Sequence, residues 1–87
     1  MANMKVFVPC DMIEARKATV AAAKIWGPAY LRFGREKMPV FTTEETPFIP
    51  GKAEIFWESA GKGSRKKNPQ VAIIGCGSLV HNALLAA

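Results

Sequence analysis

Two arginines, Arg32 and Arg35, flank a Phe-Gly pair in the stretch YLRFGREKMPVF, which covers residues 30–41. A guanidinium group makes bidentate, charge-assisted hydrogen bonds with phosphate or carboxylate oxygens, so two of them beside a glycine could hold an anion. The alternative is that both are ordinary solvated charges at the end of a strand. The choice between these interpretations depends on the elements that position the two side chains.

No other group of residues forms a catalytic pattern. His81 is the single histidine, and no serine, cysteine or carboxylate lies at a sequence spacing from it that would indicate a catalytic group. We therefore expect His81 on the surface or edge of a helix. The glutamates show no paired spacing that would assign acid and base roles. Cys10 and Cys76 stand alone, which predicts two reduced, packed thiols and neither a zinc site nor a redox pair.

Two further motifs have weak functional interpretations. The sequence GCGS at residues 75–78 follows an apolar run, as in loops whose backbone amides approach a pyrophosphate. It lacks the third glycine of that motif, so a tight turn is the preferred interpretation. A basic cluster has no interleaved aromatic residues, which predicts a solvated loop and argues against a nucleic-acid partner. The cluster consists of Lys62, Arg65, Lys66 and Lys67.

Composition indicates a small globular protein. With 87 residues, 49% of them hydrophobic and 22% charged, the chain can form one small domain. The net charge of +5 favours anionic partners without choosing among them. The apolar stretches are shorter than the roughly 18 residues of a membrane span, and the beginning lacks the hydrophobic region of a signal peptide. We therefore expect a cytoplasmic protein without a membrane partner.

The first part of the chain predicts a parallel β-α-β unit. Its elements are a strand over residues 4–9, a helix over 12–25 and a strand over 29–33. The short connections between these elements favour a parallel crossover. Arg32 and Arg35 then lie at the carboxyl end of the second strand, where ligands collect in α/β sheets.

The predicted helix has signals at both ends. Asp11 can cap the free N–H groups of the first turn, and Glu14 can reach back to complete a capping box. Gly27 and the proline after it end the helix. One face of the helix is expected to pack on the sheet. Its positions are Met12, Ala15, Thr19, Ala22 and Trp26.

The second part predicts a linker followed by two strands and a helix. Residues 36–51 contain several prolines and show no periodic pattern, which indicates an extended linker. Residues 52–57 alternate as a strand, and residues 71–74 form a wholly apolar strand. Ser78 can cap a helix that begins at Leu79, with inward positions Leu79, Val80, Ala83, Leu84 and Ala87. We expect the two parts to pack into one small α/β domain with a mixed sheet.

Four stretches together resemble, in order and spacing, one continuous segment of the transketolase family, which includes 1-deoxy-D-xylulose-5-phosphate synthase. They are MKVFVPCDMIEARKAT, GPAYLRFGREKMPVF, GKAEIFWE and QVAIIGCGSLVHNALLAA. The resemblance implies three regions. Residues 1–35 would be the end of a pyrimidine-binding domain, residues 36–51 an interdomain linker, and residues 52–87 the start of a C-terminal domain.

Members of that family use thiamine diphosphate and magnesium to move a two-carbon ketol unit between sugar phosphates. The resemblance implies that Arg35 contacts the phosphate of the substrate, with Arg32 either supporting it or solvated. The family's diphosphate and metal motif, its activating glutamate and its substrate-channel histidines have no counterpart in this chain. We therefore expect no catalytic, cofactor-binding or metal-binding residue here, and no catalysis by this chain alone.

This interpretation makes the chain a fragment or subunit of a transketolase-like enzyme. Its partners would be a chain that binds thiamine diphosphate or a second copy of itself, and a sugar phosphate would be its small-molecule ligand. The alternative is a small basic module that binds an anion or another protein and has no catalytic role.

Overall fold

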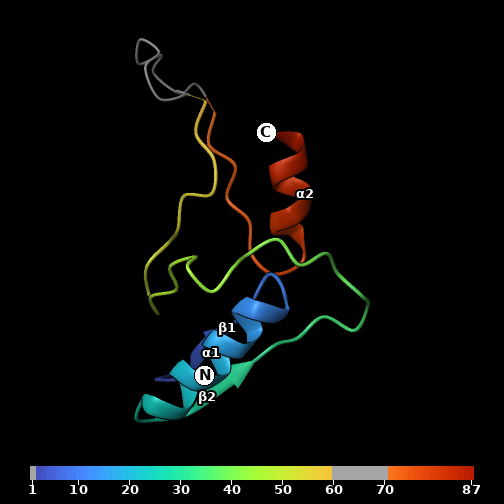
Figure 1. Ribbon diagram of the computed structural model, residues 1–87. Helices are drawn as coiled ribbons and strands as arrows, with labels where there is room; N and C mark the ends of the chain where they lie inside the picture. The colour runs from blue at the N-terminus through green and yellow to red at the C-terminus, as the bar shows by residue number, and fades with distance from the viewer. Residues whose placement is uncertain (1, 60–70) are drawn as a thin grey trace.

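The computed structural model describes residues 2–59 and 71–87. Its elements are, in chain order, β1 (Lys5–Phe7), α1 (Met12–Lys24), β2 (Ala29–Leu31) and α2 (Leu79–Ala86) (Figure 1). The predicted α/β class is confirmed. Within the described ranges, no helix is long and apolar enough to cross a membrane.

The strands β1 and β2 form a parallel pair in which Val6 lies opposite Tyr30. The backbone N–H of Arg32 donates to the Phe7 carbonyl at 2.9 Å, so the ladder extends one residue beyond β2. The helix α1 connects the two strands and contacts β2. The predicted parallel β-α-β unit is therefore confirmed, with shorter strands than expected.

The helix α1 begins at the predicted residue because Asp11 caps it. The Asp11 carboxylate accepts a hydrogen bond from the backbone N–H of Glu14 at 2.9 Å. The Glu14 carboxylate reaches back one residue further than a capping box requires, since it accepts from the backbone N–H of Cys10 at 3.2 Å. The helix ends at Lys24, shortly before Gly27, whose φ of 110° suits only glycine.

The face of α1 that becomes buried is only partly the predicted one, because Ala15 and Ala22 are half-buried but the other predicted positions are exposed. Ala18 is fully buried at 0% exposure, whereas Met12 and Trp26 are 70% and 96% exposed. The helix has 13 residues and each strand has three. The helix is therefore roughly 20 Å long and overhangs strands of about 10 Å, which leaves its ends uncovered.

Residues 36–51 contain no helix or strand, as predicted, but they fold back onto α1 instead of running free. The aromatic ring of Phe41 packs against the rings of Phe56 and His81, with centroid distances of 6.0 and 5.6 Å. The backbone N–H groups of Phe41 and Thr42 both donate to Asp11. This segment therefore joins the first and second parts of the chain.

The two strands predicted in the second part do not form. Residues 52–57 and 71–74 have no strand assignment, although both stretches are drawn out (yellow and orange in Figure 1). Within the described ranges, residues 53–59 and 71–76 make no backbone hydrogen bond with each other. A strand requires a hydrogen-bonded neighbour, and sequence alternation alone does not supply one. The turn and basic cluster predicted between them lie outside the described residues.

The helix α2 begins at Leu79 as predicted, but without the predicted cap. The side chain of Ser78 makes no capping hydrogen bond, and its backbone is already helical with φ −60° and ψ −24°. Of the predicted inward positions, Val80, Ala83 and Leu84 are half-buried. Leu79 and Ala87 are exposed because nothing in the described part of the chain covers them.

Gly77 links the beginning of α2 to the end of β1. Its backbone N–H donates to the Val8 carbonyl at 3.1 Å, and its φ is 60°. A Cβ atom on Gly77 would lie 2.9 Å from the Val8 Cγ1. Both the backbone conformation and the available space therefore require glycine. The first and second parts of the chain therefore contact each other, as predicted, but the predicted mixed sheet is wrong: in the described ranges the sheet has only the two parallel strands β1 and β2.

Candidate functional site

The two arginines singled out by their spacing lie at the carboxyl end of β2. Arg32 directly follows the strand, and Arg35 is in a bend three residues further on. Both are exposed. Within the described part of the chain, neither guanidinium group has a hydrogen bond or an ion pair. Both groups can therefore present their N–H donors to an anion in solution.

The glycine before Arg35 lies against the side chain of Met38. A Cβ atom on Gly34 would lie 3.2 Å from the Cε of Met38 and 3.4 Å from its Sδ. The half-buried Met38 side chain covers the Gly34 backbone at this distance. A larger residue at position 34 would therefore displace the end of the Met38 side chain.

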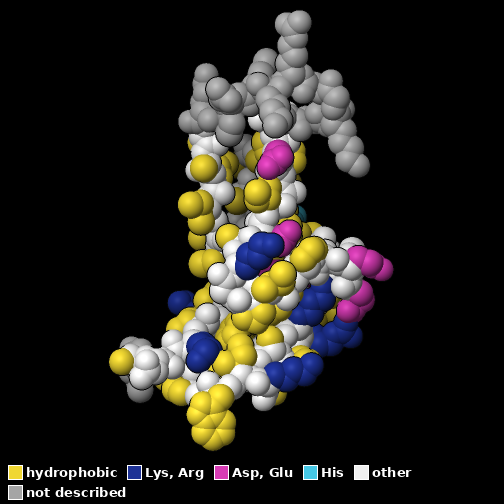
Figure 2. Space-filling model, turned by 90° about the vertical axis from the view of Figure 1, so that its left-hand side faces the viewer, with side chains coloured by type: hydrophobic (Ala, Val, Ile, Leu, Met, Phe, Trp, Pro, Cys, Tyr) yellow, Lys and Arg dark blue, Asp and Glu magenta, His cyan; other side chains and the backbone are white. Residues whose placement is uncertain are grey.

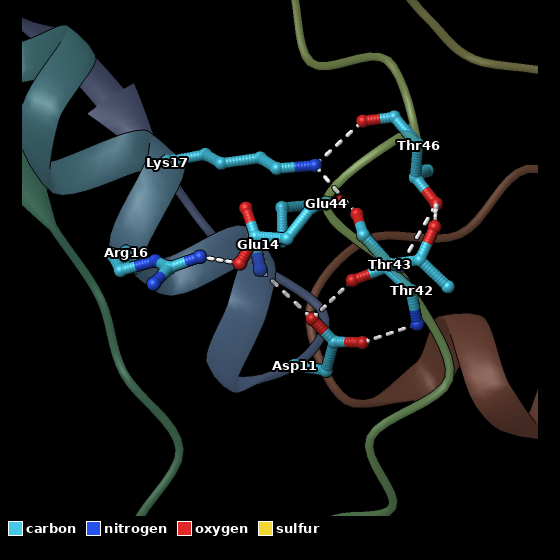
Figure 3. Close-up of polar contacts among 8 residues, drawn as sticks. All are labelled: Asp11, Glu14, Arg16, Lys17, Thr42, Thr43, Glu44 and Thr46. Carbon is cyan, nitrogen blue, oxygen red and sulfur yellow. Dashed lines mark hydrogen bonds and ion pairs between the residues drawn. The ribbon is translucent and has the colours of Figure 1, made fainter.

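A second polar centre lies at the beginning of α1, where the linker meets the helix (Figure 3). The Asp11 carboxylate is 2% exposed and accepts hydrogen bonds through both oxygens. Besides Glu14, its donors are the Phe41 N–H at 3.0 Å, the Thr42 N–H at 2.7 Å and the Thr42 hydroxyl at 2.7 Å. We call Asp11, Phe41 and Thr42 the linker clasp. It holds the linker against the helix.

Two basic residues of α1 extend the contact with the linker. The ammonium group of Lys17 donates to the carbonyls of Thr43 and Thr46 at 2.7 and 2.6 Å. Arg16 forms an ion pair with Glu44. These charges neighbour a shallow groove of about 620 Å³ between α1 and residues 44–48. Arg16 and Lys17 are thus engaged with the linker, whereas Lys24, which also lines the groove, is exposed.

The surroundings of the clasp shift two pKa values in opposite directions. Burial by itself raises the pKa of Asp11, but the hydrogen bonds from Glu14, Thr42 and Phe41 outweigh it and lower that pKa below its ordinary value. Burial first, and then the Glu14 carboxylate, raise the pKa of the Cys10 thiol well above its ordinary value. The Cys10 Sγ donates to the Glu14 carboxylate at 3.1 Å. Cys10 is therefore held as a neutral thiol.

The remaining candidates from the sequence are the two cysteines, His81 and the basic cluster. Cys10 is buried as predicted, but Cys76 is exposed, which corrects the expectation of two packed thiols. His81 is half-buried against Phe41. The described residues hold no group of three metal-ligating side chains. The cluster Lys62, Arg65, Lys66 and Lys67 lies outside the described residues.

The GCGS motif forms a tight turn, as the sequence favoured. Gly77 and Ser78 are in a turn, and the Val80 N–H donates to the Gly77 carbonyl at 3.2 Å. The Gly77 N–H already donates to Val8, so it is not free to bind a phosphate. This arrangement supports the structural interpretation of the motif.

Sequence reasoning missed the linker clasp. It assigned Asp11 to the helix cap alone and gave Thr42 no role. The cap is a local contact with a recognisable pattern, whereas the bonds to Phe41 and Thr42 join residues 30 and 31 positions apart. The one available signal was a pair of threonines in a stretch otherwise rich in proline and glutamate.

The fold and the site together define a small α/β segment with two exposed arginines at the carboxyl end of a strand. Mouse transketolase-like protein 2 is 34% identical over 85 residues, which is 98% of this chain and 12% of that protein. Bovine transketolase-like protein 1 is 31% identical over 85 residues, covering 98% of this chain and 13% of the relative. Human transketolase is 32% identical over 82 residues, covering 94% of this chain and 12% of that enzyme.

Nearly the whole chain is thus similar to one segment of transketolases and transketolase-like proteins, and it spans about an eighth of the length of these relatives. No protein-family model matches it. No solved structure matches it either.

Proposed function

We propose that this chain is a fragment or subunit of a transketolase-like enzyme and that Arg35 contacts the phosphate of a sugar phosphate. The observation that carries the proposal is the exposed position of Arg35 at the carboxyl end of β2. The similarity to transketolases over 94 to 98% of the chain supports it. A planar guanidinium group next to a glycine bend suits bidentate contact with phosphate oxygens.

In this proposal the chain supplies part of a substrate site and a second chain supplies the thiamine diphosphate and magnesium. The chain by itself would then catalyse no step of the ketol transfer. Its own role would be to orient the phosphate end of the substrate. Ketol transfer should appear only when the chain is mixed with the partner that binds the cofactor, and background activity in such mixtures would contradict the split-enzyme proposal.

The phosphate contact can be tested on this chain alone by amide NMR. Adding fructose 6-phosphate should shift the amide signals of Gly34, Arg35 and Glu36, and adding fructose should not. Arg35→Ala should abolish the shifts. Lys37→Ala, which removes an equal charge two residues away at an exposed position, should leave most of the response. Arg35→Lys should bind more weakly, because a lysine lacks the bidentate fork.

Three results would overturn the assignment of Arg35. One is an equal response to fructose and to its phosphate, which would mean that the phosphate is not recognised. Another is an unchanged response in Arg35→Ala. The third is an equal loss of the amide response in Lys37→Ala and Arg35→Ala, which would mean that general positive charge, and not Arg35 itself, attracts the phosphate.

A further inference from the structure

The groove between α1 and residues 44–48 has the size of a small-molecule site. Its volume is about 620 Å³, and such sites typically measure roughly 300–1,000 Å³. Its lining from α1 includes Lys17, Ala21 and Lys24, which are four and three positions apart and therefore share one face of the helix. Figure 2 shows basic side chains gathered beside acidic ones on the right of the view, with hydrophobic side chains next to them.

Contacts within the chain hold the two walls of the groove in place. The ammonium group of Lys17 donates to the carbonyls of Thr43 and Thr46, which fixes the linker against α1 (Figure 3). The aromatic ring of Phe48 packs against the ring of Phe7 in β1 with a centroid distance of 6.4 Å. Because these contacts need no ligand, the groove is formed before anything binds, and this lowers the entropic cost of binding.

The floor of the groove is apolar. It consists of Val20 and Ala21 from α1 and of Pro47 and Phe48 from the linker. Val20 is 49% exposed, and Phe48 is half-buried. An apolar group placed here removes both side chains further from water, and an aromatic ring can also pack against the ring of Phe48. The floor therefore favours a ligand with an aromatic body.

The charges at the two ends of the groove differ. Lys24 is in the last turn of α1, is exposed, and makes no hydrogen bond or ion pair within the described ranges. Glu45 lies near Lys17, roughly 10 Å back along the helix. Hydrogen bonds from its own backbone N–H and from the Thr43 hydroxyl lower the pKa of Glu45, so it stays ionised. An anion is therefore attracted to the Lys24 end and repelled from the Glu45 end.

We propose that this groove binds a small organic anion with an aromatic body, of the class of arylalkanoic carboxylates. The carboxylate contacts the Lys24 ammonium group, and the aromatic ring covers Val20 and Phe48. Val20 and Lys24 are four positions apart, which is roughly 6 Å along the helix, and a short alkyl chain between ring and carboxylate spans that distance. The site goes beyond the proposed phosphate contact, because Arg35 does not line the groove.

Amide NMR on the whole chain tests the site with three probes. The probe 4-phenylbutanoate has both features, 4-phenylbutylammonium has the same body with the opposite charge, and acetate has the charge without the body. Adding 4-phenylbutanoate should shift the amide signals of Val20, Ala21, Lys24 and Phe48. The cation should bind about fivefold more weakly, because it faces Lys24. Acetate should bind more than about tenfold more weakly, because it covers no apolar surface.

Two variants, each with a matched control, assign the contacts. Lys24→Gln should weaken the binding of 4-phenylbutanoate about two- to fivefold, which is the range of an exposed ion pair. Its control is Lys37→Gln, which makes the same change at an exposed residue outside the groove. Val20→Glu should weaken binding about tenfold, because it puts a carboxylate in the apolar floor. Its control is Val40→Glu, at a residue that is 51% exposed and also outside the groove.

Several results would overturn the proposal. One is a 4-phenylbutanoate titration that leaves the amides of α1 and Phe48 unmoved, and another is equal binding of the cation. Equal losses in either variant and its control would also overturn it. Shifts confined to residues 34–36 would assign the anion to Arg35 and exclude the groove. Because the phosphate test reads residues 34–36 and this test reads α1 and Phe48, either proposal can fail while the other stands.

Discussion

Replacing Asp11 with asparagine distinguishes an ordinary helix cap from the linker clasp. Asparagine and aspartate cap helices about equally well, so the substitution would change the free energy of unfolding by close to zero if Asp11 only capped α1. In the clasp, however, the second carboxylate oxygen accepts from the N–H groups of Phe41 and Thr42 at 3.0 and 2.7 Å. An asparagine must turn its NH₂ group toward one of the two sets of donors.

The expected loss follows from the bonds that this conflict removes. One carboxylate oxygen accepts from the Glu14 N–H and the Thr42 hydroxyl, and the other from the two linker N–H groups. Hydrogen bonds to a charged group contribute about 1.5–3 kcal/mol each, so losing two costs roughly 3–6 kcal/mol. That is a large part of the roughly 5–15 kcal/mol by which small domains are stable.

The assay is urea unfolding followed by far-UV circular dichroism, with the free energy of unfolding taken from the midpoint and the slope. Glu36→Gln is the control, because it removes the same charge from an exposed residue. Thr42→Val should cost about 1 kcal/mol, since it removes one hydroxyl donor and keeps both N–H donors. If Asp11→Asn unfolds at the same urea concentration as Glu36→Gln, the linker does not bind Asp11 in solution.

Three further predictions concern acid, thiols and glycine. Because folding lowers the pKa of Asp11, its stabilisation is present above the unfolded value of about 3.9 and is lost as pH falls through the folded value. Urea midpoints should therefore fall below about pH 4 in the natural chain and less in Asp11→Asn, and parallel curves would contradict this. Ellman's reagent should modify exposed Cys76 quickly and buried Cys10 only as fast as the chain unfolds, so equal rates would exclude burial of Cys10. Gly77→Ala should lower the urea midpoint more than Gly51→Ala, because Gly51 has a φ of 82° but open space around a Cβ atom. Equal losses would mean that Val8 does not crowd Gly77.

Local signals in the sequence predicted the first part of the fold well. Asp11 as a cap and Gly27 as a stop fixed the bounds of α1 to within one residue, because capping depends on neighbours in the chain. Strand, helix and strand joined by short connections predicted the parallel pair β1 and β2. The same kind of signal failed for residues 52–57 and 71–74, since a strand also needs a partner that is distant in sequence.

The sequence alone determined the capped helix, the parallel β-α-β unit, the glycine turn before α2 and the similarity to transketolases. These depend on residue types, local spacing and residue order. Only the tertiary structure decided that Asp11 binds the linker and that Ala18 is buried on α1 while Met12 and Trp26 are exposed. It also decided that Gly77 contacts Val8. Each of these contacts joins segments that are distant in the sequence, and a local pattern of residues does not predict such contacts.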